Sequence, residues 1–258
     1  MTRTVPRIVA IGGGDIRKLA TLPIDRTVVR LTGKRRPKAL FIPTASGDAE
    51  RYVEAFHRVY GKKLGCRTAA LELFRSRPSR AEMRSMVLGS DLIYVGGGNT
   101  YRMMKLWRRL GVDRALRTAA TRGVVLAGLS AGAICWFRHG HSDSRRKPGQ
   151  KRWKAIRVSG LGLVGALFCP HYHSEHRERS LARMVARHGG ATLACDNHAA
   201  LEIAGDTWRV LTSRRSGRAY RLLKRRGKVR VELLPADGTY RPLGDLLAGR
   251  PTPATGRP

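Results

Sequence analysis

Four short apolar runs recur along the first half of the chain, and glycines or small polar residues end each of them. The runs cover residues 7–15 (RIVAIGGGD), 38–46 (KALFIPTAS), 91–100 (DLIYVGGGNT) and 123–132 (GVVLAGLSAG). Their apolar positions are consecutive rather than alternating, which is typical of strands that are buried on both faces. The pattern therefore predicts a parallel sheet.

Between the runs, apolar residues recur at intervals of three and four, as on one face of a helix. One such stripe lies after residue 48 and consists of Tyr52, Val53, Phe56, Val59 and Tyr60. A second stripe follows the potential helix caps Asn99 and Thr100 and consists of Met103, Trp107 and Leu110. The alternation of strands and helices predicts an α/β fold with a mostly parallel sheet flanked by helices.

The pattern changes from about residue 200, where ALEIAG, TWRVLTS, RAYRLLKR and KVRVELLP are typical of short strands separated by turns. We expect these strands to form an antiparallel edge of the same sheet. The last ten residues, GRPTPATGRP, have the Pro, Gly and Thr content of a disordered segment. We therefore expect one α/β domain over residues 1–245 and a disordered tail over residues 246–258.

The charge of the chain is its most unusual bulk property. It has 258 residues and a formal net charge of +33, so its surface should attract nucleic acid and other polyanions. The basic residues are nevertheless scattered, and neither a zinc-finger spacing nor an aromatic RNA-binding signature is present. Non-specific binding of nucleic acid therefore stays open as a hypothesis.

Cysteine spacing and apolar run length indicate the compartment. Cys66, Cys135, Cys169 and Cys195 are widely spaced, which excludes a disulfide framework or a CxxC metal motif. No apolar run reaches the ~18 residues of a membrane span, so we expect no membrane association. Together these features predict a cytoplasmic protein.

Two glycine clusters, at 12–14 and 96–98, resemble part of a dinucleotide-binding loop. Arg17 and Tyr101 stand where the third glycine of GxGxxG belongs, and no GxxxxGK[ST] motif is present. We therefore expect no nucleotide cofactor.

The run at 123–132 contains GxSxG, as Gly128-Leu129-Ser130-Ala131-Gly132. In a nucleophile elbow, a strand turns sharply into a helix, and the flanking small residues avoid clashes in that turn. The turn exposes the serine Oγ and directs the next amide, here that of Ala131, at a developing oxyanion. A serine nucleophile needs a base, and His171 follows the apolar run LFC at 167–169, so it too is expected at the carboxyl end of a strand.

A metal site is the alternative for this histidine segment. Cys169, His171 and His173 alternate, so an extended backbone would direct all three side chains to one face. A fourth ligand at a suitable spacing is missing, which disfavours the metal site.

Several ordered motifs together suggest a family. The chain has Gly-Gly-Gly-Asn-Thr at 96–100, Gly-Leu-Ser-Ala-Gly-Ala at 128–133, Cys-Pro-His-Tyr at 169–172 and Phe-Ile-Pro-Thr-Ala-Ser at 41–46. In these motifs it resembles peptidase E, family S51 of serine peptidases, over about residues 7–205. The resemblance implies a flavodoxin-like sandwich related to class I glutamine amidotransferases. It also implies metal-free hydrolysis of dipeptides with an N-terminal aspartate, through an acyl-enzyme.

The resemblance also implies roles for particular residues. Ser130 would be the nucleophile and His171 the base, while the oxyanion hole would use the amide of Gly97 or Gly98 together with that of Ala131. Asn99 and Arg179 are the residues that it suggests for substrate binding.

The acidic member of the triad stays open. Related hydrolases often carry a glutamate where this chain has Asn197. That departure favours Asp143 as the acid and leaves Asp196 and Glu202 as alternatives.

Other functions compete with a peptidase. An α/β-hydrolase esterase shares GxSxG, but it usually places its histidine late and uses an HGGG-type loop that is absent here. A glutamine-amidotransferase subunit would need cysteine in place of Ser130. A non-catalytic polyanion-binding protein on a hydrolase-like scaffold would explain the charge, and it remains open.

Overall fold

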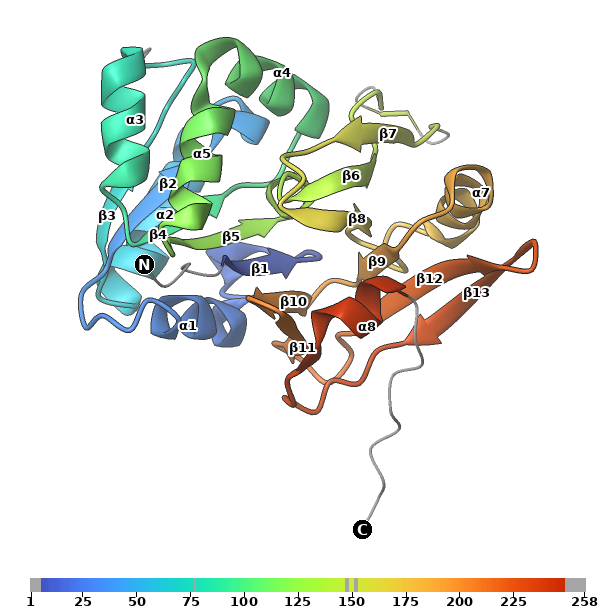
Figure 1. The fold of residues 1–258 in the computed structure, drawn as a ribbon. Helices are drawn as coiled ribbons and strands as arrows, with labels where there is room; N and C mark the ends of the chain where they lie inside the picture. The colour runs from blue at the N-terminus through green and yellow to red at the C-terminus, as the bar shows by residue number, and fades with distance from the viewer. Residues whose placement is uncertain (1–5, 77, 147–148, 151–152, 249–258) are drawn as a thin grey trace.

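The computed structural model describes residues 6–76, 78–146, 149–150 and 153–248, which form two β-sheets (Figure 1). The larger sheet has eight strands in the spatial order β14-β11-β10-β1-β5-β4-β2-β3. Five neighbouring strands of this sheet are parallel: β1 (Arg7–Ile11), β5 (Val125–Leu129), β4 (Leu92–Val95), β2 (Lys38–Ile42) and β3 (Arg67–Ala70). The other three are antiparallel: β10 (Ala199–Ala204), β11 (Thr207–Thr212) and β14 (Arg241–Pro242).

Helices cover both faces of the larger sheet. On one face lie α3 (Arg80–Leu88), α4 (Thr100–Leu110) and α5 (Val112–Thr121); on the other lie α1 (Leu22–Arg30) and α2 (Glu50–Phe56), which continues as a π-helix (His57–Lys63). Within β1, Ile8 and Ala10 belong to one core cluster, and Val9 and Ile11 belong to the other. The strand is therefore buried on both faces, which confirms the predicted layered α/β fold.

The two helical stripes lie where the spacing predicts them. Phe56, Val59 and Tyr60 are the buried residues on one face of the helical segment that starts at residue 50. Asn99 is the N-cap of α4, since its side chain accepts a hydrogen bond from the Arg102 N–H at 2.9 Å. Two short 3₁₀-helices, Ile16–Lys18 and Thr44–Ser46, follow the ends of β1 and β2.

The second sheet was not predicted as a separate layer. Its six strands have the order β13-β12-β9-β8-β6-β7. They are β6 (Phe137–Ser142), β7 (Ile156–Ser159), β8 (Val164–Cys169), β9 (Thr192–Cys195), β12 (Ala219–Arg225) and β13 (Lys228–Leu233). We expected all the late strands to extend one sheet, but β12 pairs with β9, and only β10, β11 and β14 join the larger sheet. Helix α7 (Glu178–His188) packs against β12 and β13.

The end of the described chain differs from the expected tail. Helix α8 spans Leu243–Ala248, and Leu246 within it is buried. Arg221 donates a hydrogen bond to the Asp245 carbonyl at 3.0 Å, which holds this helix against β12. Residues 246–248 are therefore helical rather than disordered, and the remainder of the predicted tail lies outside the described residues.

Two properties bear on the surroundings of the protein. All four cysteines are buried free thiols. In the part of the chain that the structure describes, no helix is both long and apolar enough to cross a membrane.

Candidate active site

Ser130 lies in a sharp turn between β5 and α6 (Ala131–Ile134), with φ 54° and ψ −108°. A positive φ is uncommon for a residue with a Cβ and is found where the surroundings hold the backbone. The Ser130 N–H donates to the Ile11 carbonyl at 3.0 Å, and its carbonyl accepts from the N–H groups of Ala133 and Ile134, each at 3.0 Å. This is the strand–turn–helix context that a nucleophile elbow requires.

The two glycines of the GxSxG motif allow close packing around this turn. A Cβ on Gly128 would lie 2.2 Å from the Gly132 carbonyl oxygen, and a Cβ on Gly132 would lie 2.1 Å from that of Val95. Both distances are far below van der Waals contact, so no side chain fits at either position. The motif therefore lets α6 pack directly against β5 and β4.

His171 lies in the turn that follows β8, and its N–H donates to the Gly12 carbonyl at 3.2 Å. The preceding carbonyl of the same segment, that of Ile11, holds the Ser130 N–H. Two consecutive carbonyls at the end of β1 therefore hold the candidate nucleophile and the candidate base. The sheets meet here, because β5 belongs to the larger sheet and β8 to the smaller one. We expected the two residues to follow neighbouring strands of one sheet.

The side chain of His171 has a defined partner, since its Nδ1 lies 2.7 Å from Asn197 Oδ1. A proton on Nδ1 donates to this amide oxygen and leaves Nε2 free to accept a proton. Burial lowers the pKa of His171 below its ordinary 6.5, against the raising effects of Glu175 and Asn197. The imidazole is therefore neutral at neutral pH, as a general base must be.

None of the three acids considered from sequence hydrogen bonds to His171 within the described chain. Asp143 lies 3.7 Å from the buried Arg177 guanidinium, and it acts on the His171 pKa only through its charge. Asp196 accepts from the His173 N–H at 2.9 Å. Glu202 is fully buried and pairs with Arg209 at 2.8 Å.

The prediction of Asp143 as the orienting group therefore needs correction. The carboxylate of Asp143 forms an ion pair with Arg177, and its charge, without a hydrogen bond, acts on His171. The neutral amide of Asn197 contacts the histidine itself. In the sequence, an asparagine at this position favours Asp143 as the orienting group, so this contact was not expected.

Gly13 is a site residue that sequence reasoning missed. A Cβ at this position would lie 2.0 Å from Asn197 Oδ1 and 2.4 Å from His171 Nδ1. Gly13 and Asn197 also form an isolated parallel bridge, and the Gly13 carbonyl accepts from the His198 N–H at 3.0 Å. The glycine cluster at 12–14 could have indicated this role. It lacks the third glycine of a nucleotide-binding loop, so close packing against other residues is the remaining explanation for three small residues in a row.

Backbone amides from two loops lie next to the elbow. A Cβ on Gly97 would lie 3.5 Å from Ser130 Cβ, which places this residue beside the serine. The Gly97 N–H donates to the Tyr52 hydroxyl at 3.3 Å, whereas the Gly98 N–H has no acceptor among the described residues. The Ala131 N–H is the first of α6, so no carbonyl of that helix accepts it. Among the residues that the structure describes, the N–H groups of Gly98 and Ala131 therefore have no acceptor.

Tyr52 is the second residue near this site that the sequence did not indicate. Its position in the sequence predicts only that it lies on the apolar face of a helix. Burial raises its pKa to about 12, so the hydroxyl stays protonated. The oxygen accepts the Gly97 N–H, and its own proton remains available for donation.

A cavity of about 480 Å³ opens beside Gly97 and Leu129. Its charged lining comes from Asp15, Arg17 and Arg51, of which Asp15 and Arg17 form an ion pair at 2.9 Å. Arg179, which we expected to bind substrate, is exposed on α7 and is not part of this lining.

The other residue expected to bind substrate, Asn99, has a structural role in this fold. Its Oδ1 accepts the Arg102 N–H at 2.9 Å, and its Nδ2 donates to the Ser144 carbonyl at 2.9 Å. Its side chain therefore caps α4 and fastens the turn after β6.

The segment considered as a metal site has other contacts. Cys169 is fully buried, His171 contacts Asn197, and His173 lies 3.0 Å from Asp196. Across the described residues, no cluster of three histidine, cysteine or acidic side chains has an arrangement that could hold a metal ion.

Known proteins resemble this chain in sequence and in fold. The model of peptidase family S51 matches residues 8–211. A protein of Bacillus subtilis (strain 168), named uncharacterized peptidase YgaJ, is 35% identical over 221 residues, which cover 84% of this chain and 92% of that protein. Uncharacterized peptidase Lmo0363 of Listeria monocytogenes is 28% identical over 180 residues, 68% of this chain and 85% of that protein.

Two solved structures have the same fold. A peptidase from an acI-B1 Actinobacterium has a TM-score of 0.71 at 20% identity, with 93% of this chain and 98% of that one covered. A putative peptidase E protein from Listeria monocytogenes EGD-e has a TM-score of 0.62 at 20% identity, with 82% and 100% covered. The family match over most of the chain and the relative at 35% identity show that this chain belongs to peptidase family S51.

Proposed function

We propose that this peptidase is a serine exopeptidase in which Ser130 and His171 carry the chemistry. Ser130 Oγ attacks the scissile carbonyl carbon while His171 Nε2 takes its proton, and the imidazolium then protonates the leaving amine. The C–N bond breaks and an ester to Ser130 remains. A water molecule, deprotonated by the same Nε2, hydrolyses this ester and restores the serine.

Asn197 is the orienting group of this mechanism. Its Oδ1, 2.7 Å from His171 Nδ1, favours the tautomer with the proton on Nδ1. A neutral amide stabilises the imidazolium less than a carboxylate does, and the negative charges of Glu175 and Asp143 nearby supply part of that stabilisation.

The developing oxyanion is stabilised by the free N–H groups of Gly98 and Ala131, with Tyr52 as a third donor beside Gly97. Removing a single donor from such a hole typically slows the reaction about 10²–10³-fold. The glycine at 98 is needed for backbone reasons, because it has φ 138° and its Cβ would lie 2.2 Å from the Ala45 carbonyl oxygen.

We propose small peptides with an N-terminal aspartate as substrates, as the family resemblance implies. The cavity beside Gly97 supports this choice, since Arg17 and Arg51 on its wall can pair with a substrate carboxylate. Arg17 is already paired with Asp15, which leaves Arg51 as the first candidate in place of Arg179.

The observation that carries the proposal is the pair of consecutive carbonyls at the end of β1. They hold the elbow serine on one side and a neutral, amide-oriented histidine on the other. Few structural roles require a strained serine and a tautomer-selected histidine in one place.

Ser130→Ala tests the proposal, with Ser174→Ala, an exposed serine near His171, as the matched control. We expect the purified protein and the control to hydrolyse Asp-Leu faster than Asn-Leu or Lys-Leu, and Ser130→Ala to lose this activity at an unchanged Tm. A fluorophosphonate should add mass to the protein and to the control but not to Ser130→Ala. Absence of both hydrolysis and labelling in the unmodified protein would refute the serine mechanism, and faster turnover of a short p-nitrophenyl ester than of any peptide would favour an esterase.

A further inference from the structure

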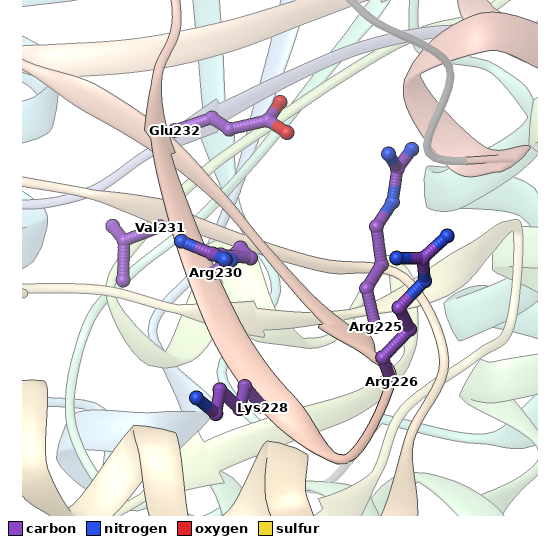
Figure 2. Close-up of a pocket in the computed structure, with 6 residues that line it drawn as sticks. All are labelled: Arg225, Arg226, Lys228, Arg230, Val231 and Glu232. Atoms are coloured by element: carbon purple, nitrogen blue, oxygen red, sulfur yellow. The ribbon is translucent and has the colours of Figure 1, made fainter.

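The hairpin of β12 and β13 carries a basic hollow that the peptidase chemistry does not use (Figure 2). Its volume is about 810 Å³, and its lining consists of Arg225, Arg226, Lys228, Arg230, Val231 and Glu232. Strand β13 is one of the two edge strands of the six-stranded sheet, and β12 and β9 separate it from β8, the strand that leads to His171. The hollow is therefore on a different surface from the active site.

The hollow has a strong excess of positive charge. Four cationic side chains surround it, and its one carboxylate, Glu232, is already engaged by the buried guanidinium of Arg221. Arg226, Lys228 and Arg230 have no acidic partner among the described residues. Other arginines in this chain are neutralised, for example Arg177 by Glu175 at 2.5 Å and Arg241 by Asp237 at 2.7 Å.

The turn of the hairpin places an arginine where the backbone disfavours it. Arg226 and Gly227 connect Arg225 to its partner Lys228, with φ values of 48° and 76°. Two positive φ values in succession define a type I′ turn, whose first position usually holds asparagine, aspartate or glycine. Arg226 accepts this strained conformation and has no partner within the described chain, which indicates a role toward an external ligand.

We propose that this hollow binds the phosphate backbone of nucleic acid. Guanidinium groups match phosphate oxygens in a two-pronged geometry, and three of the four cations here are arginines. No aromatic side chain lines the hollow, so bases have no stacking platform and binding is independent of sequence. Val231 is its one apolar lining residue, too little to anchor the hairpin in a lipid surface.

Two triple variants distinguish the effect of this hairpin on binding from the effect of the net charge of the protein. Arg226→Gly with Lys228→Gln and Arg230→Gln neutralises the hollow. Arg84→Gln with Arg114→Gln and Arg117→Gln removes the same charge from exposed residues of α3 and α5. Binding to a labelled 20-base-pair DNA duplex is measured by fluorescence anisotropy at several salt concentrations, and the rate of Asp-Leu hydrolysis is measured in parallel.

The hairpin variant should bind at least tenfold more weakly than the unmodified protein, and the control variant less than threefold. Loss of three phosphate contacts should flatten the slope of log K against log salt by about 2.7. Arg226→Gly alone should lower affinity while Tm stays equal or rises, because glycine relieves the positive φ, so unfolding cannot explain the loss. Peptide hydrolysis should not change in any of these variants.

Three outcomes would overturn the proposal. The first is no binding to DNA by the unmodified protein at low salt. The second is an equal loss in the hairpin and control variants, which would mean that only the net charge matters. The third is hairpin-dependent binding to phosphatidylserine vesicles that exceeds binding to the duplex, which would make the ligand a membrane surface.

Discussion

At the scale of single residues, the proposed catalytic site differs from an ordinary Ser-His-Asp triad in the group that contacts His171 Nδ1. The partner of His171 Nδ1 is the amide oxygen of Asn197, where a carboxylate was expected. With its Oδ1 toward the ring, the amide accepts a proton on Nδ1 as a carboxylate would, but it carries no charge to stabilise the imidazolium. Burial lowers the pKa of His171, and the Glu175 charge and the hydrogen bond to Asn197 offset that lowering only in part.

Substitution of Asn197 separates these two effects. Asn197→Ala should lower kcat roughly 10²–10⁴-fold with KM nearly unchanged, because the tautomer is no longer selected. Asn197→Asp should retain activity and move the acidic limb of the kcat/KM profile to higher pH, since a carboxylate raises the pKa of His171. The pH dependence of Asp-Leu hydrolysis measures both, and an Asn197→Ala variant with full activity would contradict the assignment.

Tyr52 gives a second prediction at this scale. Its hydroxyl accepts a hydrogen bond from the Gly97 N–H and keeps a proton to donate, so Tyr52→Phe removes one donor from the proposed oxyanion hole without changing the ring packing. We expect kcat to fall about 100-fold, with little change in KM. Steady-state kinetics of Asp-Leu hydrolysis by Tyr52→Phe and by the unmodified protein measure both constants. An unchanged kcat would mean that the Gly97 amide reaches the oxyanion itself.

At the scale of elements, the end of β1 holds the site together. Ile11 and Gly12 accept hydrogen bonds from Ser130 and His171, while Gly13 provides the space that His171 and Asn197 occupy. Three segments that are distant in sequence therefore meet at one strand end. Within the glycine cluster at 12–14, Gly13 makes room for the side chains of His171 and Asn197, whereas the glycines of a nucleotide-binding loop make room for phosphate.

Gly13→Ala tests this role of β1. The added methyl would lie 2.0 Å from Asn197 Oδ1, so it should displace the pair, lower kcat at least tenfold and destabilise the fold by about 1–3 kcal/mol. Gly165→Ala is the matched control, because its Cβ on β8 would meet nothing within 4 Å. Thermal unfolding and hydrolysis rates are measured for both. Equal behaviour of the two variants would contradict the packing argument.

At the scale of the whole molecule, buried histidines make stability depend on pH. Burial and the charge of Arg177 lower the pKa of His141 to about 3, and its Nδ1 has no hydrogen-bond partner within the described chain. An unfolded chain protonates this residue below about pH 6.5, whereas the folded chain does so only near pH 3. Between these values the unfolded state binds the additional proton, so stability falls as the pH falls.

Replacement of His141 measures this contribution. Between pH 7.5 and pH 5, the unmodified protein should lose about 2 kcal/mol more unfolding free energy than His141→Gln, which cannot titrate. Urea unfolding at the two pH values provides the comparison. Parallel pH dependence in the unmodified protein and His141→Gln would contradict the assignment.

Much of the fold could be predicted because its signals are local. Continuous apolar runs such as 92–95 mark buried parallel strands, and the stripes of α2 and α4 and the cap of α4 lie in adjacent turns of chain. The division into two sheets could not be predicted, because β12 carries the same pattern whether it pairs with β11 or with β9. Strand pairing depends on contacts between residues that are distant in the sequence, and the local pattern of apolar residues carries no information about such contacts.

The same division applies to the site. The sequence by itself determined the elbow at Ser130 and the turn position of His171, because GxSxG describes the sterics of one short segment. Only the tertiary structure decided that Asn197 contacts the histidine, that Asp143 pairs with Arg177, and that Gly13 must lack a side chain. His171 and Asn197 are brought together by strand order, and a contact of that kind exists only once the two sheets have formed.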